Sequence, residues 1–454
     1  MTYLKLMPDS DQLAISNFNQ SITYNELKKR VSDVVRKYQF FQERSVVWID
    51  CRNTIETLIY FLAFWEKNCC TIPIDPQMTL GEIQSLYKII PPNLIINQSE
   101  TSKIKDLPLS KDLNSDIQDA NTVQLSSGST GEPKIILISN KAILFRALSN
   151  RNHLRLNVQD KTLCTVPLSH SHGIDCLALP TLFAGGQLYI NDPQSAFPYR
   201  ILDWIEKYKI TFFSSIPQMY DYFNQVFLQN NGQKKWNLDS LRYPFCGSAA
   251  LPLSTANDFN KNFNLSLRQG YGLAEIGVIC VNLKTEFQKY DSIGEPIAGI
   301  EWKLASDGEL LVKSDALFSG YYKKSQETAD RMNKEGYLQT EDLINIDNGF
   351  FYIVGRKNDF INVMGKKVYP KEIEEKISKC INIKEFCVTG APDTERGQIA
   401  VLHLLDTGEN KEGVESLIYQ DLQLHLESYK IPRKIVWHKS FPKSPLGKIL
   451  KSKL

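Results

Sequence analysis

The residues best suited to chemistry form the stretch Ser-Ser-Gly-Ser-Thr-Gly-Glu-Pro-Lys at positions 126–134. Its glycines let backbone N–H groups approach an anion, its hydroxyls donate hydrogen bonds, and Lys134 adds positive charge. The stretch is therefore predicted to bind phosphate. It lacks the Gly-x-x-x-x-Gly-Lys-Ser/Thr pattern of a Walker A loop, and strand-like residues flank it at 122–125 and 135–138. We expect a loop that joins two strands instead of one that opens a helix.

Five further segments follow along the chain. They are Gly247-Ser248-Ala249-Ala250, Gly270-Tyr271-Gly272-Leu273-Ala274-Glu275, Tyr337-Leu338-Gln339-Thr340-Glu341-Asp342, Gly355-Arg356-Lys357-Asn358-Asp359 and Pro445-Leu446-Gly447-Lys448. Together with the phosphate-binding stretch, and in this order, they resemble the motifs of the adenylate-forming superfamily. That superfamily includes acyl- and aryl-CoA ligases, peptide-synthetase adenylation domains and firefly luciferase. The resemblance spans residues 122–448, and its specificity comes from the order of the whole set.

The resemblance implies a reaction in two steps. A carboxylate attacks the α-phosphorus of ATP and releases pyrophosphate, and a thiol of CoA or of a carrier's phosphopantetheine then takes the acyl group. The residues implied for ATP and AMP are Ser126, Ser127, Gly128, Ser129, Thr130, Gly131 and Lys134 at the phosphates, Gly247, Ser248, Ala249, Tyr271 and Gly272 at adenine, and Asp342 and Arg356 at the ribose. Glu275 would hold Mg²⁺, a hard cation that prefers oxygen ligands. Lys448 would bridge the substrate carboxylate and the α-phosphate.

The acyl side of the site is expected around the segment Pro167-Leu168-Ser169-His170-Ser171-His172-Gly173. By resemblance, His170 is the catalytic histidine beside the acyl and phosphate groups. Amino-acid-activating relatives usually carry an aspartate where this chain has His172, so a carboxylic acid without an α-amine is favoured. Asp175 is either a replacement for that aspartate or a helix-start residue. The roles of His172 and Asp175 and the identity of the acid stay open.

Two positions depart from the superfamily pattern. Ala274 stands where a threonine usually precedes the motif glutamate, which removes one hydroxyl contact to phosphate or metal. Asn358 stands at the hinge, where aspartate or lysine is common, and asparagine tolerates unusual backbone angles. The resemblance implies that the C-terminal domain rotates about this hinge. The rotation would replace Lys448 at the site by a thiol tunnel that contains Val363 and Gly365.

The elements that must position these residues alternate between helix and strand. Thr23 and Glu26 form a capping-box signature, and strand-like runs follow at 45–50, 71–74 and 93–96. This rhythm predicts an α/β fold in which helices cover parallel sheets. After residue 300, the turn signals Asp307-Gly308-Glu309 and Asp347-Asn348-Gly349 indicate antiparallel hairpins, the small barrel-like part of the large domain. We predict an N-terminal adenylation domain at 1–357 and a small mobile α+β domain at 358–454, with helices at 370–379 and 412–427.

Composition excludes several other classes of protein. The 454 residues are 42% apolar and 23% charged with a net charge of +2, which argues against disorder and against bulk electrostatic binding of nucleic acid. The longest apolar run, at 58–65, is too short to span a membrane, and no secretory signal is visible. Nine cysteines without a Cys-x-x-Cys pair favour reduced thiols in the cytoplasm. The final Ser452-Lys453-Leu454 also matches a peroxisomal address.

The sequence therefore predicts an ATP-dependent acyl- or aryl-CoA ligase that acts on a small carboxylic acid. A free-standing adenylation enzyme that loads a carrier protein in trans is the main alternative, because no carrier attachment motif is fused to the chain. A luciferase-like oxygenase and a non-catalytic nucleotide-binding protein are further alternatives, the latter disfavoured by the presence of Lys448, Glu275 and Asp342. Oligomeric state is not predicted.

Overall fold

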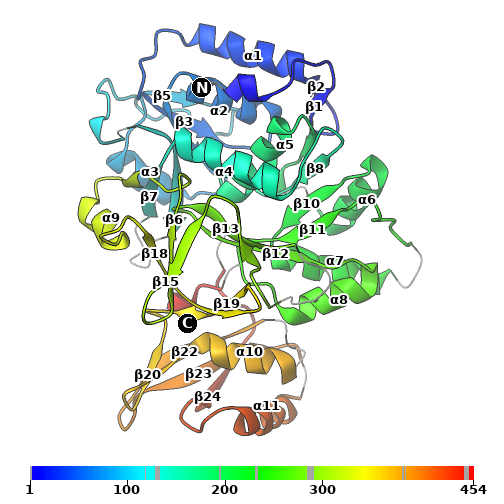
Figure 1. The fold of residues 1–454 in the computed structure, drawn as a ribbon, viewed down its shortest axis with the longest axis vertical. Coiled ribbons are helices and arrows are strands. Elements are labelled where there is room, and N and C mark those ends of the chain that lie inside the picture. The colour runs from blue at the N-terminus through cyan, green and yellow to red at the C-terminus, as the bar shows by residue number, and fades with distance from the viewer. Residues whose placement is uncertain are drawn as a thin grey trace.

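The computed structural model describes residues 3–117, 119–127, 133–193, 196–230, 234–283, 291–380, 383, 385–408, 410–443 and 449–454. For residues 126, 127, 133, 379 and 452 it describes the backbone alone. Two large sheets and a four-stranded sheet form the N-terminal part, and a further sheet with two helices forms the C-terminal part (Figure 1). The predicted α/β class is confirmed. No helix in the described ranges is long and apolar enough to cross a membrane.

The first sheet has six strands in the order β17-β7-β6-β4-β3-β5. They are β3 (Val46–Asp50), β4 (Cys70–Ile74), β5 (Leu94–Ile96), β6 (Ala120–Ser127), β7 (Pro133–Ser139) and β17 (Gly320–Tyr321). Strands β3, β4, β5 and β6 run parallel, while β6 and β7 form an antiparallel pair on either side of the predicted phosphate loop. This hairpin agrees with the expectation that the loop joins two strands. The sheet carries α2 (Ile55–Glu66), α3 (Leu80–Ile89) and α4 (Asn140–His153) between its strands in the chain.

The second sheet has nine strands in the order β14-β13-β12-β11-β10-β8-β9-β1-β2. They are β1 (Leu13–Ser16), β2 (Ser21–Thr23), β8 (Lys161–Cys164), β9 (Gln187–Ile190), β10 (Phe212–Ser215), β11 (Tyr243–Cys246), β12 (Arg268–Leu273), β13 (Gly277–Asn282) and β14 (Glu295–Pro296). Its centre is parallel, and its pairs at both ends are antiparallel. Its helices are α5 (Leu179–Phe183), α6 (Pro198–Tyr208), α7 (Pro217–Gln229) and α8 (Leu253–Phe263), with a π-helical turn at His172–Ala178.

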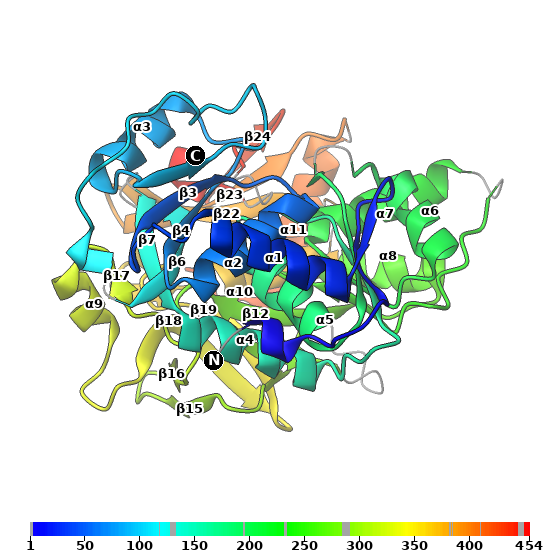
Figure 2. The ribbon, with the colours of Figure 1, turned by 90° about the horizontal axis from the view of Figure 1, so that it is seen from above.

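One continuous core joins the two large sheets. It contains Ile49 of β3, Leu62 of α2, Leu188 of β9 and Ile279 of β13. The helix α1 (Tyr24–Lys37) begins at the predicted capping box, in which Thr23 and Glu26 bond each other's backbone N–H. Figure 2 shows α1 and α2 side by side over the molecule's centre. Helix α2 contains the apolar run of residues 58–65, and nearly all of these residues are buried. That run is thus a core helix.

The third sheet is antiparallel, as the turn signals predicted. Its strands are β15 (Glu301–Leu304), β16 (Glu309–Lys313), β18 (Leu338–Asp347) and β19 (Phe350–Arg356), with α9 (Ser325–Arg331) between β17 and β18 in the chain. Asn348 and Gly349 alone join β18 to β19, and both have positive φ, at 50° and 82°. A two-residue hairpin turn of this kind matches the twist of the strands, which explains the asparagine–glycine pair.

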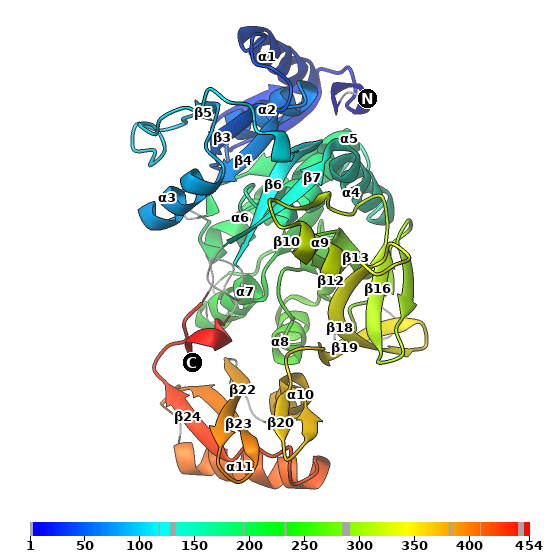
Figure 3. The ribbon, with the colours of Figure 1, turned by 90° about the vertical axis from the view of Figure 1, so that its left-hand side faces the viewer.

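The C-terminal part has its own sheet and its own core (Figure 3). Its elements are β20 (Ile361–Val363), β21 (Lys366–Val368), α10 (Pro370–Cys380), β22 (Phe386–Asp393), β23 (Gly397–Leu405), α11 (Lys411–His425) and β24 (Lys434–His438). The two predicted helices end within one or two residues of the observed positions, and β22 is longer than the run around residue 387 suggested. Short 3-10 turns occur at Tyr3–Leu6, Ser115–Ile117 and Lys451–Lys453.

Candidate active site

Three side chains predicted to bind the nucleoside meet in one hydrogen-bonded cluster. Asp342 on β18 is 3% exposed, and its carboxylate accepts from Tyr271 Oη of β12 at 2.5 Å and from Arg356 Nε of β19 at 3.0 Å. The register of β18 and β19 places Asp342 opposite Arg356, so local pairing brings those two together. Burial, together with Asp342, raises the pKa of Tyr271, so the phenol stays protonated and donates a hydrogen bond to the carboxylate. The carboxylate is therefore held in a fixed orientation.

Glu275 lies in a turn between β12 and β13, and a tyrosine that the motifs did not reveal binds its carboxylate. Tyr321 Oη donates to Glu275 Oε1 at 2.7 Å, and burial, with Glu275 itself, raises the pKa of this phenol. Lys134, at the end of the phosphate stretch, has its ammonium 5.0 Å from the centre of the Tyr321 ring and 3.3 Å from Glu327. Tyr321 therefore connects the predicted metal-binding residue with the phosphate loop's lysine.

The residues around Glu275 fit the way proteins hold Mg²⁺. This ion keeps several waters and uses one or two carboxylates together with substrate phosphates, instead of an all-protein cage. The part of the chain that the structure describes contains no group of three or more histidine, cysteine or acidic side chains arranged to bind a metal. Glu275 supplies one carboxylate and is joined through Tyr321 to Lys134, which suits an ion of this kind.

A histidine lies against the predicted adenine segment. His172 Nδ1 is 2.9 Å from Ser248 Oγ, and its Nε2 is 2.6 Å from Ser214 Oγ on β10. A methyl group added to Gly247 would come within 3.6 Å of the same ring, so the imidazole borders this segment closely. Burial, helped by His170, lowers the pKa of His172 to about 4. The ring is neutral at pH 7 and both of its nitrogens are engaged by hydroxyls.

The two other candidates on the acyl side are His170, which is half-buried, and Asp175, which is buried. Burial lowers the pKa of His170, with Asp75 opposing the shift, so this ring is also neutral at pH 7. Asp175 is 3% exposed within the π-helical turn, where its carboxylate accepts from Ser171 and from the guanidinium of Arg146. It is therefore committed to protein partners and is not a free acid for a substrate amine. Local sequence did not signal this, because Arg146 lies on a different helix.

The expected hinge residue adjoins the nucleoside cluster, whereas the expected thiol residues lie in the first hairpin of the C-terminal sheet. Asn358 Nδ2 donates to Glu341 Oε1 at 3.2 Å, immediately after β19 ends. Val363 is buried in the C-terminal core, whereas Gly365 has φ of +82° in the turn between β20 and β21. A side chain at Gly365 would meet no atom within 4 Å. In this conformation of the described chain, the turn faces open space.

Several predicted residues lie outside the described ranges. These are Gly128, Ser129, Thr130 and Gly131 of the phosphate loop and the lysine Lys448. For Ser126 and Ser127 only the backbone is described, paired with Lys134 and Pro133 across the hairpin. Gly247 is buried, Ala249 is half-buried, and Gly272 lies on β12 with its α-carbon packed against the Gly277 backbone.

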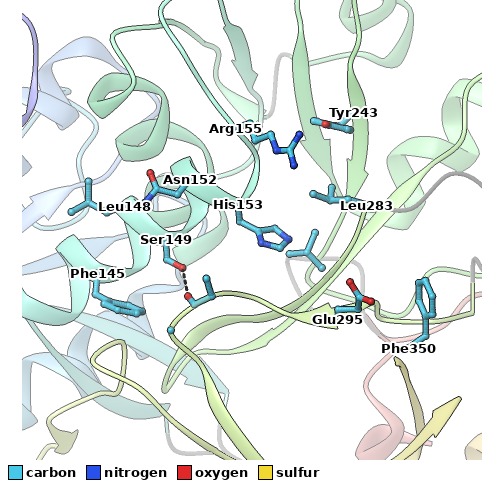
Figure 4. A pocket seen from close by; sticks show the side chains of 13 residues that line it. Phe145, Leu148, Ser149, Asn152, His153, Arg155, Tyr243, Leu283, Glu295 and Phe350 are labelled. Atoms are coloured by element: carbon cyan, nitrogen blue, oxygen red, sulfur yellow. Dashed lines mark hydrogen bonds between the residues drawn. The ribbon is translucent and has the colours of Figure 1, made fainter. Parts of the chain in front are cut away.

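A cavity of about 770 Å³ lies in a different place, and Figure 4 shows side chains that line it. Its lining includes Phe145, His153, Arg155, Tyr243, Glu295 and Phe350. None of the predicted site residues borders it, so the candidate site is defined by its chemistry and not by this cavity.

Comparison with known proteins agrees with these observations. The family described as "AMP-binding enzyme" matches residues 7–322, and the family "AMP-binding enzyme C-terminal domain" matches residues 372–448. A feruloyl-CoA synthase of Amycolatopsis sp is 28% identical over 365 residues, which is 77% of this chain and 71% of that protein. A long-chain-fatty-acid–CoA ligase of Bacillus subtilis is 29% identical over 356 residues, 74% of this chain and 61% of the ligase.

Solved structures give the same result for the fold. The crystal structure of ATP-bound MatB from Rhodopseudomonas palustris has a TM-score of 0.87 at 21% identity, covering 99% of this chain and 97% of that one. Because the first family match alone covers well over half of the chain, and the C-terminal family match follows it, the protein belongs to the AMP-binding enzymes of the adenylate-forming superfamily.

Proposed function

We propose that this enzyme is an AMP-forming acid–thiol ligase that activates a carboxylic acid with ATP and transfers the acyl group to CoA. The observation that carries the proposal is the cluster of Tyr271, Asp342 and Arg356, which come from three strands and meet at one buried carboxylate. A buried carboxylate with a fixed orientation suits the two hydroxyls of a ribose, which donate hydrogen bonds. The CoA ligases among the relatives support the same reaction class.

In the first step, an oxygen of the substrate carboxylate forms a bond to the α-phosphorus, and the bond from that phosphorus to pyrophosphate breaks. Negative charge develops on oxygens around the phosphorus, so catalysis needs cations and positioning more than a protein nucleophile. Lys134 and Lys448 would supply positive charge, and Glu275 would hold the Mg²⁺ that accompanies the phosphates. The bound metal ion would draw charge from the phosphate oxygens.

In the second step, the thiol of CoA loses its proton and its sulfur bonds to the acyl carbon, while the bond to AMP breaks. We place the domain boundary at Lys357/Asn358, because β19 ends at Arg356 and the next sheet begins at Ile361. Rotation about Asn358 would bring the turn at Gly365 to the site for this step. A methyl group added to Gly365 would meet nothing within 4 Å in the present conformation, so this position has room for a pantetheine arm.

The acid is proposed to lack an α-amine. An ammonium group needs an anionic or strongly accepting partner, but His172 is neutral and bonded to two serines. Asp175 is already paired with Arg146. Aryl and fatty acids, the substrates named for the two relatives above, remain the candidates. The nine free cysteines, all buried or half-buried, are compatible with the reducing cytoplasm that we propose as the enzyme's location.

A pyrophosphate-exchange screen tests the proposal. Labelled pyrophosphate should enter ATP in the presence of Mg²⁺ and one class of aryl or fatty acid, and CoA should then be consumed without any carrier protein. Adenylate that persists with CoA but reacts with a carrier protein would favour the carrier-loading alternative. No exchange across aryl, fatty and amino acids would overturn the assignment as a ligase.

A further inference from the structure

A buried arginine on α4 reaches three separate parts of the chain. Arg146 Nε donates to the carbonyl of Ala316 at 2.9 Å, Nη2 donates to the carbonyl of Ala274 at 3.3 Å, and Nη1 pairs with Asp175 Oδ2 at 3.4 Å. The side chain is 1% exposed. Ala274 immediately precedes the predicted magnesium residue Glu275 in the chain. One guanidinium thus holds the backbone of the turn that carries Glu275.

Asp175, the partner of Arg146, extends the contacts to two other segments of the site. Ser171 Oγ donates to Asp175 Oδ2 at 2.6 Å, and Ser171 lies between the two acyl-side histidines in the sequence. The side chain of Gln124 also hydrogen-bonds this carboxylate. Gln124 belongs to β6, two residues before the phosphate stretch begins. Asn150 of α4 donates to the backbone carbonyl of Asp175 at 3.1 Å and fixes the turn itself.

The turn after Glu275 packs directly on the arginine's stem. Gly277 has φ of +76°, and a methyl group there would lie 3.1 Å from Arg146 Cδ. The backbone N–H of Phe318 donates to the Glu275 carbonyl at 2.6 Å, so the residues that follow Ala316 hold the same turn from the other side. Where other family members have a threonine, this chain has Ala274, whose side chain offers no hydroxyl. Here the backbone carbonyl of that residue is held by Arg146 instead.

We propose that Arg146 and Asp175 form a positioning pair that sets the orientation of Glu275, the phosphate-loop strand and the histidine segment relative to one another. This inference rests on the proposed function, because it assumes that these segments bind magnesium and ATP. Removing two charges from water is costly, and apolar side chains of similar size often serve stability as well as a buried ion pair. Ala274, Ser171 and Gln124, three partners of the pair, belong to or lie next to segments of the site, which gives the pair a role beyond stability.

Binding of magnesium–ATP tests the pair without knowledge of the acid. Arg146→Lys keeps a cation beside Asp175 but cannot bridge three acceptors, so calorimetry should show affinity for MgATP that is lower by about tenfold or more. The affinity for ATP in EDTA should fall by much less, because Glu275 acts through the metal. Arg151→Lys is the matched control: it lies on the same helix, and its guanidinium donates to the Phe183 carbonyl, away from the site. This control should bind MgATP like the wild type.

Single variants that leave one buried charge unpaired can unfold the protein, so a double variant separates folding from positioning. Arg146→Met with Asp175→Leu removes both charges together, and thermal unfolding identifies whether the fold is retained. We expect a folded protein that binds MgATP more weakly than the wild type. It should also need a higher Mg²⁺ concentration than the wild type for pyrophosphate exchange. If the folded double variant binds MgATP as the wild type does, the pair serves stability alone and the inference is wrong. A wild type that binds no MgATP would instead overturn the proposed function, and this inference with it.

Discussion

The N-terminal and C-terminal parts of this enzyme hold their predicted functional residues in opposite ways. In the N-terminal part, Asp342 and Asp175 are buried and each is bonded to several side chains. In the C-terminal part, Gly365 occupies a turn where an added methyl group would meet nothing within 4 Å, and its neighbour Met364 is 64% exposed. The proposed function assigns the first part a fixed geometry for the nucleotide and the second part the groups that are exchanged between the two steps. Four experiments test this contrast.

The largest effect is expected at Glu275. Glu275→Gln removes the charge that we propose holds Mg²⁺ and should slow pyrophosphate exchange on the order of 10²-fold or more. Glu335→Gln is the control, because Glu335 is exposed and its side chain pairs with Lys303. Exchange at the wild-type rate in Glu275→Gln would show that the N-terminal part does not bind the metal through this residue.

Substitutions that each impair only one half-reaction would show that different groups of the C-terminal part serve the two steps. Lys448→Ala should abolish adenylate formation yet leave thiol transfer from preformed acyl-adenylate largely intact, and Gly365→Leu should do the reverse. Because Gly365 has positive φ, the leucine also adds backbone strain. Gly408→Leu controls for that strain, since Gly408 has φ of +80° and also faces open space. Single-turnover assays measure each half, and equal damage to both halves by Lys448→Ala and Gly365→Leu would refute the alternation of the domain.

A smaller, conformational effect is expected at the junction of the two parts. Asn358→Pro fixes φ and should trap one arrangement, so that one half-reaction slows on the order of tenfold more than the other. Asn358→Ala removes only the hydrogen bond to Glu341 and should leave the ratio of the two rates unchanged. If both half-reactions run at the same rates in Asn358→Pro as in the wild type, the hinge lies at another residue.

The smallest effect concerns stability at acid pH, which both parts should share. The pKa of His172 and that of His403 are each lowered to about 4, mainly by burial, against about 6.5 in an unfolded chain. Protonation therefore favours unfolding, and the stabilising contribution is complete above pH 6.5 and declines as the pH falls towards 4.

Urea unfolding should show each histidine costing about 2 kcal/mol of unfolding free energy between pH 7 and pH 5. His172→Asn or His403→Asn should each reduce this dependence. His425→Asn, at an exposed position on α11, should leave it unchanged. A pH dependence that survives loss of both buried histidines would assign the effect to other groups.

Sequence predicted those parts of the site that short motifs encode. Tyr271, Asp342 and Arg356 each lie in a recognisable segment, and the hairpins at Gly308 and Gly349 follow from their turn residues. The partners of these segments were not predicted, because their contacts join residues far apart in the chain. Tyr321 reaches Glu275 across 46 positions, and no local pattern signals that contact. The sequence left open that Asp175 binds a substrate amine. It did not show that α4 packs so as to bring Arg146 next to this carboxylate.

The short strand β17 has a consequence for how the molecule is made. Gly320 and Tyr321 pair with Leu137 and Ile136 of β7, so they complete a sheet whose other strands end at residue 139. During synthesis, the intervening second sheet must emerge before this edge of the first can close. Contacts of such large sequence separation form late, because the long loop between them must first be ordered. A nascent chain that stops before residue 320 therefore lacks Tyr321 beside Glu275, and the metal side of the site is completed only after both large sheets have been synthesised.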